Sequence, residues 1–254
     1  MSAPTPPPGR GLLEGRHVVV TAAAGTGIGN ATARRCLDEG ASLVIADKHE
    51  RRLAETAEEL GVTGVPCDVT VEDDVQRLFS AAIEASPTGG IDVLVNNAGL
   101  GGTARLVDMT DEQWSVVLDV TLNGTFRCTR AALRHMVERG RGVIVNNASV
   151  LGWRAQAGQA HYAAAKAGVM ALTRCAAIEA APHGVRINAV APSLAMHPFL
   201  AKVTSDELLD ELTQREAFGR AAEPWEIATV IAFLASDYST YMTGEVVSVS
   251  SQRA

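Results

Sequence analysis

The chain has 254 residues, of which 47% are hydrophobic and 20% charged, and its formal net charge is -7. This composition is typical of a soluble globular protein, and it argues against a general nucleic-acid surface, which would need clustered lysine and arginine. No apolar run approaches the roughly 18 residues of a membrane span, so we expect neither a nucleic-acid partner nor a membrane partner.

The N-terminal stretch MSAPTPPPGR is rich in proline and lacks the apolar middle of a signal peptide. We expect residues 1–11 to form a disordered tail and residues 12–254 to form a single domain. With no targeting segment, the expected location is the cytoplasm.

Four cysteines, at positions 36, 67, 128 and 175, are far apart and form no C-x-x-C pair. They are expected to be buried thiols in a reducing compartment rather than metal ligands or disulfides.

Short β-branched runs alternate with longer segments of helical pattern. This alternation indicates βαβ units and a parallel sheet with helices on both faces. We predict seven strands, over residues 17–22, 42–47, 62–68, 91–97, 142–149, 185–192 and 245–250. Most are continuous apolar runs, as expected of strands buried on both faces. The predicted fold class is therefore a doubly wound α/β domain.

Two of the predicted strands end alike, in VLVNNAG (93–99) and VIVNNAS (143–149). Ligands bind beyond the carboxyl ends of the strands in open parallel sheets, and asparagine amides can tie neighbouring loops together there. Polar residues at these ends are therefore candidate site residues.

The stretch TAAAGTGIGN (21–30) joins the first strand to a helix and turns through Gly25, Gly27 and Gly29. Such a turn presents backbone N–H groups and the positive end of a helix dipole to an anion. The spacing fails the G-x-G-x-x-G pattern at Asn30. From the loop alone, a phosphate site and an ordinary strand-helix turn both stay open.

Asp47 ends the second strand, 18 residues beyond Gly29. This separation is close to the roughly 20 residues expected for a carboxylate that binds a ribose 2'-hydroxyl. A carboxylate there would repel the 2'-phosphate of NADP, so NAD is favoured over NADP. Two alternatives stay open: Asp47 as a helix N-cap, and a 2'-phosphate accepted by the basic residues at 48, 51 and 52.

Tyr162 and Lys166 are four residues apart in an alanine-rich segment with high helix propensity, so both side chains face the same side of a helix. An adjacent ammonium favours the phenolate, and we expect it to lower the pKa of Tyr162 from its usual value near 10. Tyr162 could then act as a general acid or base. Taken alone, such a pair is also common on helix surfaces.

Two more strand-end residues are candidates. The hydroxyl of Ser149, thirteen residues before Tyr162, could bind a substrate oxygen, and Asp68 could bind an adenine amino group. Both residue types are also common in turns.

Together these features resemble the short-chain dehydrogenase/reductase family over nearly the whole chain. The resemblance rests on the glycine-rich loop at 21–29, Asp47, the DV pair at 68–69, NNAG at 96–99, and Ser149, Tyr162 and Lys166 at the family's spacing.

The resemblance implies a Rossmann fold and an oxidoreductase that transfers a hydride between a nicotinamide cofactor and a secondary alcohol or ketone, without a metal. Tyr162 would exchange a proton with the substrate oxygen, Lys166 would bind the nicotinamide ribose and tune Tyr162, and Ser149 would orient the carbonyl. The implied cofactor-binding residues are Thr21, Gly25, Thr26, Gly27, Ile28, Asp47, Asp68, Val69, Asn97, Ala98, Gly99, Tyr162, Lys166 and Ala195. Of these, residues 97–99 would lie against the adenosine ribose, and the backbone of Ala195 would meet the carboxamide.

The sequence departs from the family in the fourth member of its catalytic tetrad, usually an asparagine. Thr121 stands there, in DVTLNGTF, and its hydroxyl could hold the water that links to Lys166. Asn123 is not expected to replace it, because it points elsewhere on a helix. The glycine-rich loop also has one extra residue, with Ala22 at the usual first glycine.

These departures resemble a bacterial subgroup that acts on CoA thioesters of partly degraded steroid rings, at a ring hydroxyl or ketone of an indane propionyl-CoA. The expected substrate lid, residues 194–220, combines apolar Met196, Phe199 and Leu200 with basic Lys202 and Arg215. The apolar residues could equally be the packed face of a lid helix.

Two other functions stay open. One is a 3-ketoacyl-thioester reductase of fatty-acid type; Asp47 argues against it, because that enzyme would prefer NADPH. The other is a dinucleotide-binding regulator without catalysis.

The family commonly forms tetramers through two long helices that flank the active site. The small-residue face of YAAAKAGVMALTRCAAIEA (162–180) suits such packing, so a homotetramer is expected.

Overall fold

The computed structural model describes residues 4–196 and 206–252. Seven parallel strands form one sheet in the order β3-β2-β1-β4-β5-β6-β7. Every predicted strand is present, most of them shorter than predicted by one or more residues at an end. The strands are β1 (His17–Thr21), β2 (Ser42–Asp47), β3 (Thr63–Pro66), β4 (Val93–Asn96), β5 (Gly142–Asn147), β6 (Val185–Pro192) and β7 (Val246–Val249).

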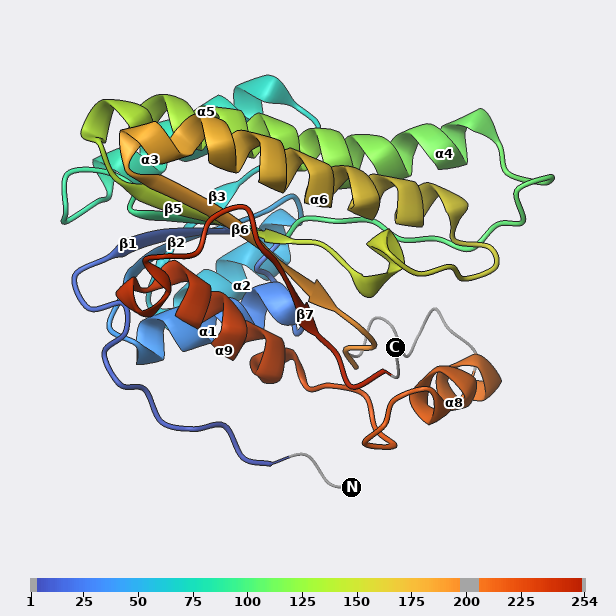
Figure 1. The fold of residues 1–254 in the computed structure, drawn as a ribbon. Helices are drawn as coiled ribbons and strands as arrows, with labels where there is room; N and C mark the ends of the chain where they lie inside the picture. The colour runs from blue at the N-terminus through green and yellow to red at the C-terminus, as the bar shows by residue number, and fades with distance from the viewer. Residues whose placement is uncertain (1–3, 197–205, 253–254) are drawn as a thin grey trace.

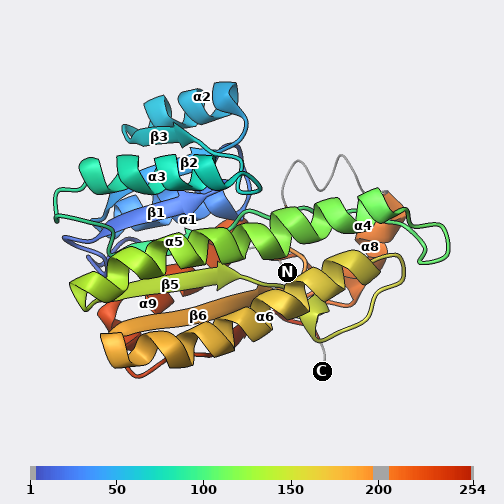
Figure 2. The same cartoon turned by 90° about the horizontal axis from the view of Figure 1, so that it is seen from above.

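Helices cover both faces of the sheet, which confirms the doubly wound fold (Figures 1 and 2). One face carries α3 (Glu72–Glu84), α5 (Gly124–Arg139) and α6 (Ala160–Ala180); the other carries α1 (Ile28–Asp38), α2 (Glu50–Leu60) and α9 (Pro224–Ala235). α4 (Asp111–Leu118) runs into α5 through a π-helical turn, η1 (Asp119–Asn123), and α8 (Asp206–Gln214) precedes α9 in the chain. None of the helices in the described ranges has the length and apolar character of a membrane span.

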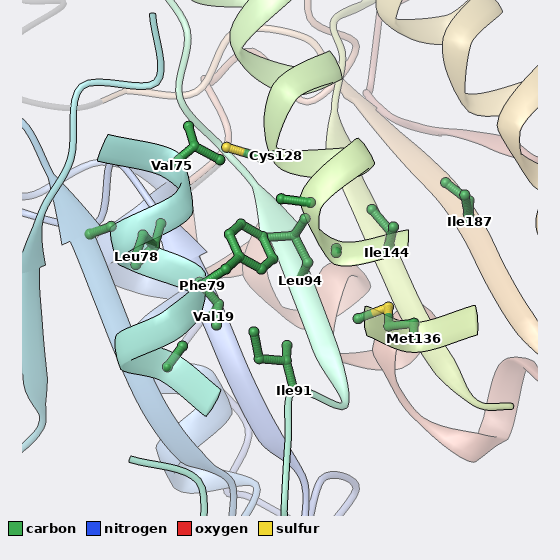
Figure 3. Close-up of a cluster of buried hydrophobic side chains, with 14 of the residues drawn as sticks. Val19, Val75, Leu78, Phe79, Ile91, Leu94, Cys128, Met136, Ile144 and Ile187 are labelled. Carbon is green, nitrogen blue, oxygen red and sulfur yellow. The ribbon is translucent and has the colours of Figure 1, made fainter. Parts of the chain in front are cut away.

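The core has a layer on each side of the sheet. Phe79, Leu94 and Ile144 belong to the layer beneath α3 and α5 (Figure 3). Along β1 the side chains alternate: Val19 joins this layer, while Val18 and Val20 join the opposite one. Since successive strand side chains point to opposite faces, burial on both faces requires the continuous apolar runs seen in the sequence.

The segment that precedes β1 is anchored to the end of α1. The buried carboxylate of Glu39 accepts hydrogen bonds from the backbone N–H groups of Arg10 (2.7 Å) and Leu12 (3.0 Å) and from the guanidinium of Arg35. Arg35 also donates to the carbonyl of Pro7. These contacts hold the end of segment 1–11, whose disorder otherwise stays a prediction.

A buried asparagine pair ties the centre of the sheet to the helices above it. Nδ2 of Asn96 donates to Oδ1 of Asn146 (2.9 Å) and to Oγ1 of Thr129 (3.0 Å). Asn146 in turn donates to Oγ1 of Thr173 on α6 (2.9 Å). Because a buried amide must find polar partners, these bonds fix α5 and α6 relative to β4 and β5.

Asn146→Ala is expected to lower the free energy of unfolding by about 2 kcal/mol, because it leaves buried polar groups of Asn96 and Thr173 without their partner. The control Asn123→Ala removes an exposed amide that contacts Asp119, and it should cost less than about 0.5 kcal/mol. Chemical denaturation followed by circular dichroism measures both. Equal stability of the two variants would contradict the role of the buried pair.

Candidate active site

The predicted site residues gather at one edge of the sheet. Thr21 ends β1 and Asp47 ends β2, while Asn97, Ser149 and Ala195 follow β4, β5 and β6 closely. Because all the strands are parallel, their carboxyl ends lie together, and β1 lies at the point where the strand order reverses.

The loop after β1 is held by Asn97. The Oγ1 of Thr21 accepts hydrogen bonds from the backbone N–H groups of Asn97 (3.0 Å) and Ala98 (3.1 Å). Nδ2 of Asn97 donates to the carbonyls of Thr21 (3.2 Å) and Ala22 (3.0 Å). A Cβ on Gly29 would lie 2.3 Å from the carbonyl oxygen of Ala22 and 2.4 Å from Nδ2 of Asn97, so this close packing requires glycine.

Ala22 takes a left-handed conformation with φ of 50°, and no other non-glycine residue in the described ranges has a positive φ. This conformation usually falls to glycine, because Cβ crowds the backbone. Ala22 therefore adopts a backbone conformation suited to glycine, although alanine stands at the position of the family's usual first glycine.

The rest of the loop leaves backbone donors available for an anion. Among the described residues, the N–H groups of Thr26, Gly27 and Ile28 have no protein acceptor. α1 begins at Ile28, and a Cβ built on Gly25 or Gly27 would meet nothing within 4 Å. Free N–H groups, open space and a helix N-terminus fit a pyrophosphate group.

Asp47 is buried beside this loop. Its carboxylate accepts hydrogen bonds from the backbone N–H groups of Ala24 (3.2 Å) and His49 (3.0 Å). Asp47 is not the N-cap of α2, which was the alternative. The N-cap residue is His49, and its side chain makes no capping hydrogen bond. The carboxylate thus lies between the glycine-rich loop and the end of β2.

Asp68 and Val69 have local partners. Oδ1 of Asp68 accepts hydrogen bonds from the backbone N–H and the hydroxyl of Thr70 (2.9 and 2.7 Å), which is the turn alternative considered for it. The side chain of Val69 is buried against Gly124 at the start of α5. A role for these residues toward adenine stays a prediction.

Tyr162 and Lys166 lie one turn apart at the start of α6, where both turn toward the strand ends. Nζ of Lys166 donates to the carbonyl of Asn147 (2.5 Å) and lies 5.6 Å from the centroid of the Tyr162 ring. Ser149 is buried after β5, and its Oγ accepts a hydrogen bond from the N–H of Leu151 (3.2 Å), so it also caps a short turn.

Burial dominates the ionisation of the two groups on α6. It lowers the pKa of Lys166 from 10.5 to about 8. It raises the pKa of Tyr162, and the interaction with the Ser149 hydroxyl acts in the opposite direction. The expected lowering of the Tyr162 pKa by Lys166 is therefore wrong for this structure, because desolvation of the phenolate outweighs the other effects.

Thr121 lies in the π-helical turn and is fully buried. Its Oγ1 accepts a hydrogen bond from the N–H of Leu100 (3.0 Å) and donates to the Leu100 carbonyl (3.2 Å). A Cβ on Gly99 would lie 3.4 Å from Nζ of Lys166 and 3.8 Å from this oxygen, so both groups flank the same glycine. Asn123 is exposed and donates to Asp119, away from the site as predicted.

The stem of the predicted lid is paired beyond β6. Ala222 donates to the carbonyl of Leu194 (2.8 Å) and accepts from the N–H of Met196 (3.0 Å). Among the described residues, the N–H and carbonyl of Ala195 between them have no partner and are available to a ligand. Phe199, Leu200 and Lys202 lie outside the described residues.

A link between the C-terminal segment and this edge of the sheet was not predicted from the sequence. Arg154 donates to Oε1 of Gln252, and Ser251 donates to the buried Glu216 (2.7 Å). The partners are at least 35 residues apart in the chain. Neither a motif nor a residue spacing in the sequence signals these contacts.

The lowered pKa of Lys166 predicts a pH-dependent stability. Between pH 8 and 10.5 the unfolded chain binds more protons at this residue than the folded protein, so its contribution to the free energy of unfolding rises with pH. The rise is at most about 1.4 kcal/mol per pH unit. In denaturation at several pH values, the free energy of unfolding of the wild type minus that of Lys166→Met should therefore rise with pH. The control Lys48→Met removes an exposed lysine and should give a flat difference; a flat difference for Lys166→Met too would contradict the lowered pKa.

Comparison with known proteins gives consistent results. Residues 22–251 match the family described as Enoyl-(Acyl carrier protein) reductase. A relative from Mycobacterium tuberculosis, (5R,7aS)-5-hydroxy-7a-methyl-1-oxo-2,3,5,6,7,7a-hexahydro-1H-indene-carboxyl-CoA reductase, is 64% identical over 98% of this chain and 97% of its own length. The 3-oxoacyl-(acyl-carrier-protein) reductase FabG of Thermotoga maritima is 37% identical over 93% of this chain and 97% of its own length.

Among solved structures, a short chain dehydrogenase from Mycobacterium smegmatis is 60% identical, with a TM-score of 0.88 over 100% of this chain and 99% of that chain. Sequence and fold thus agree over nearly the whole length, and the chain belongs to the short-chain dehydrogenase/reductase family of oxidoreductases.

Proposed function

We propose that this oxidoreductase interconverts a ring ketone and the corresponding secondary alcohol on a ring-bearing acyl-CoA of steroid breakdown, with NAD as its cofactor. The observation that carries the proposal is the placement of Ser149, Tyr162 and Lys166 beside a loop that fits a pyrophosphate. The 64% identity to a reductase named for an indene-carboxyl-CoA supports the substrate class. That name gives a carboxyl-CoA, whereas the sequence had led us to expect a propionyl side chain.

The nicotinamide, when bound, supplies or accepts the hydride. The Tyr162 hydroxyl gives a proton to the substrate oxygen during reduction and takes it back during oxidation. Its raised pKa keeps the hydroxyl protonated and ready to donate. Ser149 donates a hydrogen bond to the same oxygen, and the cationic Lys166 stabilises the phenolate that remains after the transfer.

Thr121 is proposed to complete the proton path in place of the family's asparagine. Its hydroxyl and Nζ of Lys166 flank Gly99, so a water between them would connect Lys166 with the Thr121 hydroxyl in η1. Thr121→Val keeps the shape and removes the hydroxyl.

NAD is the proposed cofactor because of Asp47. The carboxylate lies at the end of β2, next to the loop proposed for the pyrophosphate. There it can accept hydrogen bonds from a ribose diol and would repel a 2'-phosphate. The free backbone groups of Ala195 are proposed to bind the carboxamide.

A 3-ketoacyl-thioester reductase is the second candidate, favoured by the 37% identity to FabG. Asp47 argues against it, because such an enzyme would prefer NADPH. A non-catalytic regulator would not need Ser149, Tyr162 and Lys166 together.

A homotetramer assembled through α5 and α6 is the proposed assembly. Both helices carry exposed apolar side chains, including Phe126 (42% exposed) and Ile178 (77% exposed). Such residues favour a protein interface over water. The cytoplasm is the proposed location, in keeping with the free thiols of the four cysteines. Cys36, Cys67 and Cys128 are buried as expected, whereas Cys175 is exposed, so the expectation of burial is wrong for it.

Tyr162→Phe is expected to lower kcat by a factor of about 10²–10⁴, because the proton donor is lost. NADH should still bind within a few-fold of the wild-type affinity. The assay follows NADH oxidation with a bicyclic keto acyl-CoA. In the same assay, Thr121→Val should show reduced turnover and an altered pH profile, because it lacks the hydroxyl of the proposed proton path. The control Tyr238→Phe alters an exposed tyrosine and should be fully active. Undiminished turnover by Tyr162→Phe would refute the mechanism, and a wild type that binds cofactor without turnover would favour the regulator.

Asp47→Asn is expected to shift the ratio of kcat/KM for NAD over NADP toward NADP by about ten-fold or more, a change of about 1.4 kcal/mol. The amide keeps an oxygen for the loop N–H of Ala24 while removing the charge that repels the 2'-phosphate. Asp73→Asn, at an exposed position of α3, is the matched control and should leave the ratio unchanged. A ratio that stays the same in Asp47→Asn would rule out Asp47 as the discriminating group.

A further inference from the structure

We propose that Arg154 is an anchor for the phosphates of the CoA portion of the substrate, and that Gln252 of the C-terminal segment holds its guanidinium in place. The inference rests on the proposed function, since it assumes a CoA thioester substrate. It adds a binding group that lies outside the catalytic residues and the predicted lid.

Arg154 is fixed relative to the catalytic serine. A 3-10 turn, η2 (Val150–Gly152), begins directly after Ser149. Backbone hydrogen bonds continue from this turn as far as Arg154. Gly152 donates to the carbonyl of Ser149 (2.9 Å), and Trp153 and Arg154 both donate to the carbonyl of Val150 (3.0 and 2.9 Å). The backbone at Arg154 therefore keeps a set position relative to the Ser149 hydroxyl.

Gln252, the partner of Arg154, is held in place through its neighbour Ser251. The hydroxyl of Ser251 donates to Glu216 (2.7 Å), and the carbonyl of Ser251 accepts from the N–H of Ala217 (2.7 Å). Glu216 also accepts from the N–H of Leu194 (3.3 Å), at the stem of the predicted lid. The guanidinium of Arg154, bonded to Gln252, thus lies where the turn after Ser149, the lid stem and the C-terminal segment meet.

In the described part of the chain, no carboxylate pairs with the guanidinium of Arg154. It is half-buried, and among the described side chains its partner is the neutral amide of Gln252, with no carboxylate within 4 Å. The nearby Arg215 and Arg220 differ, because Glu211 and Glu226 pair with them. The expected role of Arg215 toward CoA stays a prediction.

A half-buried guanidinium with a neutral partner gains from an anion, because burial weakens its hydration and leaves donors free. Its planar set of N–H groups matches phosphate oxygens. In a chain of net charge -7, a local cation near the site favours the binding of a polyanionic substrate such as a CoA thioester. Arg154 supplies that cation, and the Gln252 amide orients it without competing for its charge.

Gln252→Glu tests the proposal most sharply, because it places a carboxylate against Arg154 without removing the arginine. This variant and Arg154→Gln are expected to raise KM for the ring acyl-CoA by about ten-fold or more, the size of a lost charge-assisted hydrogen bond, with kcat little changed. Both should leave KM for the N-acetylcysteamine thioester of the same acid unchanged, because that ester has no phosphates. Gln76→Glu adds the same charge at an exposed position of α3 and is the matched control.

Calorimetric titration with free CoA separates this inference from the proposed reaction. The wild type is expected to bind CoA more weakly at higher salt, and both variants to bind about ten-fold more weakly than the wild type. Equal effects on the two thioesters, or CoA binding unaffected by the variants, would overturn the anchor. Arg154-dependent CoA binding without turnover of the ring thioester would leave the anchor standing and reject the proposed reaction.

Discussion

The amide of Asn97 holds the candidate site together. Its Nδ2 donates to the carbonyls of Thr21 and Ala22 in the loop after β1, and its Oδ1 accepts from Nδ2 of Asn147 after β5. The carbonyl of Asn147 then accepts from Lys166 on α6. One run of hydrogen bonds therefore connects the loop after β1 with the helix that carries Tyr162. Gly29 makes it possible, since a side chain there would displace the amide.

Burial gives this edge of the sheet its chemical character. Lys166 is almost fully buried and bonded to a neutral carbonyl, so its pKa falls, while the pKa of the neighbouring Tyr162 rises. The two pKa values shift in opposite directions for the same reason: a low-polarity environment disfavours both charged forms. A phenol that stays protonated is suited to donate to a carbonyl oxygen, and a nearby ammonium then offsets the charge that forms.

The C-terminal segment links two remote parts of the chain. Its Ser251 bonds to the buried Glu216, near the stem of the predicted lid, and its Gln252 bonds to Arg154, in the turn that follows Ser149. Each bond joins parts of the chain that are remote in sequence, so the position of Arg154 depends on the completed fold. A change in the last residues of the chain can therefore move the Arg154 side chain while the sheet stays in place.

The sequence by itself determined the seven strands, their parallel arrangement and the pairing of Tyr162 with Lys166. These features are local: continuous apolar runs report burial on both faces, and a spacing of four residues places two side chains on one face of a helix. Only the tertiary structure decided the direction of the pKa shifts, the left-handed conformation of Ala22, the Asn97–Asn147 bond and the contact of Arg154 with Gln252. Each of these depends on desolvation or on partners 50 or more residues away, or on a backbone conformation that alanine seldom adopts. Residue type and spacing do not encode such effects, because they arise only when distant segments pack together.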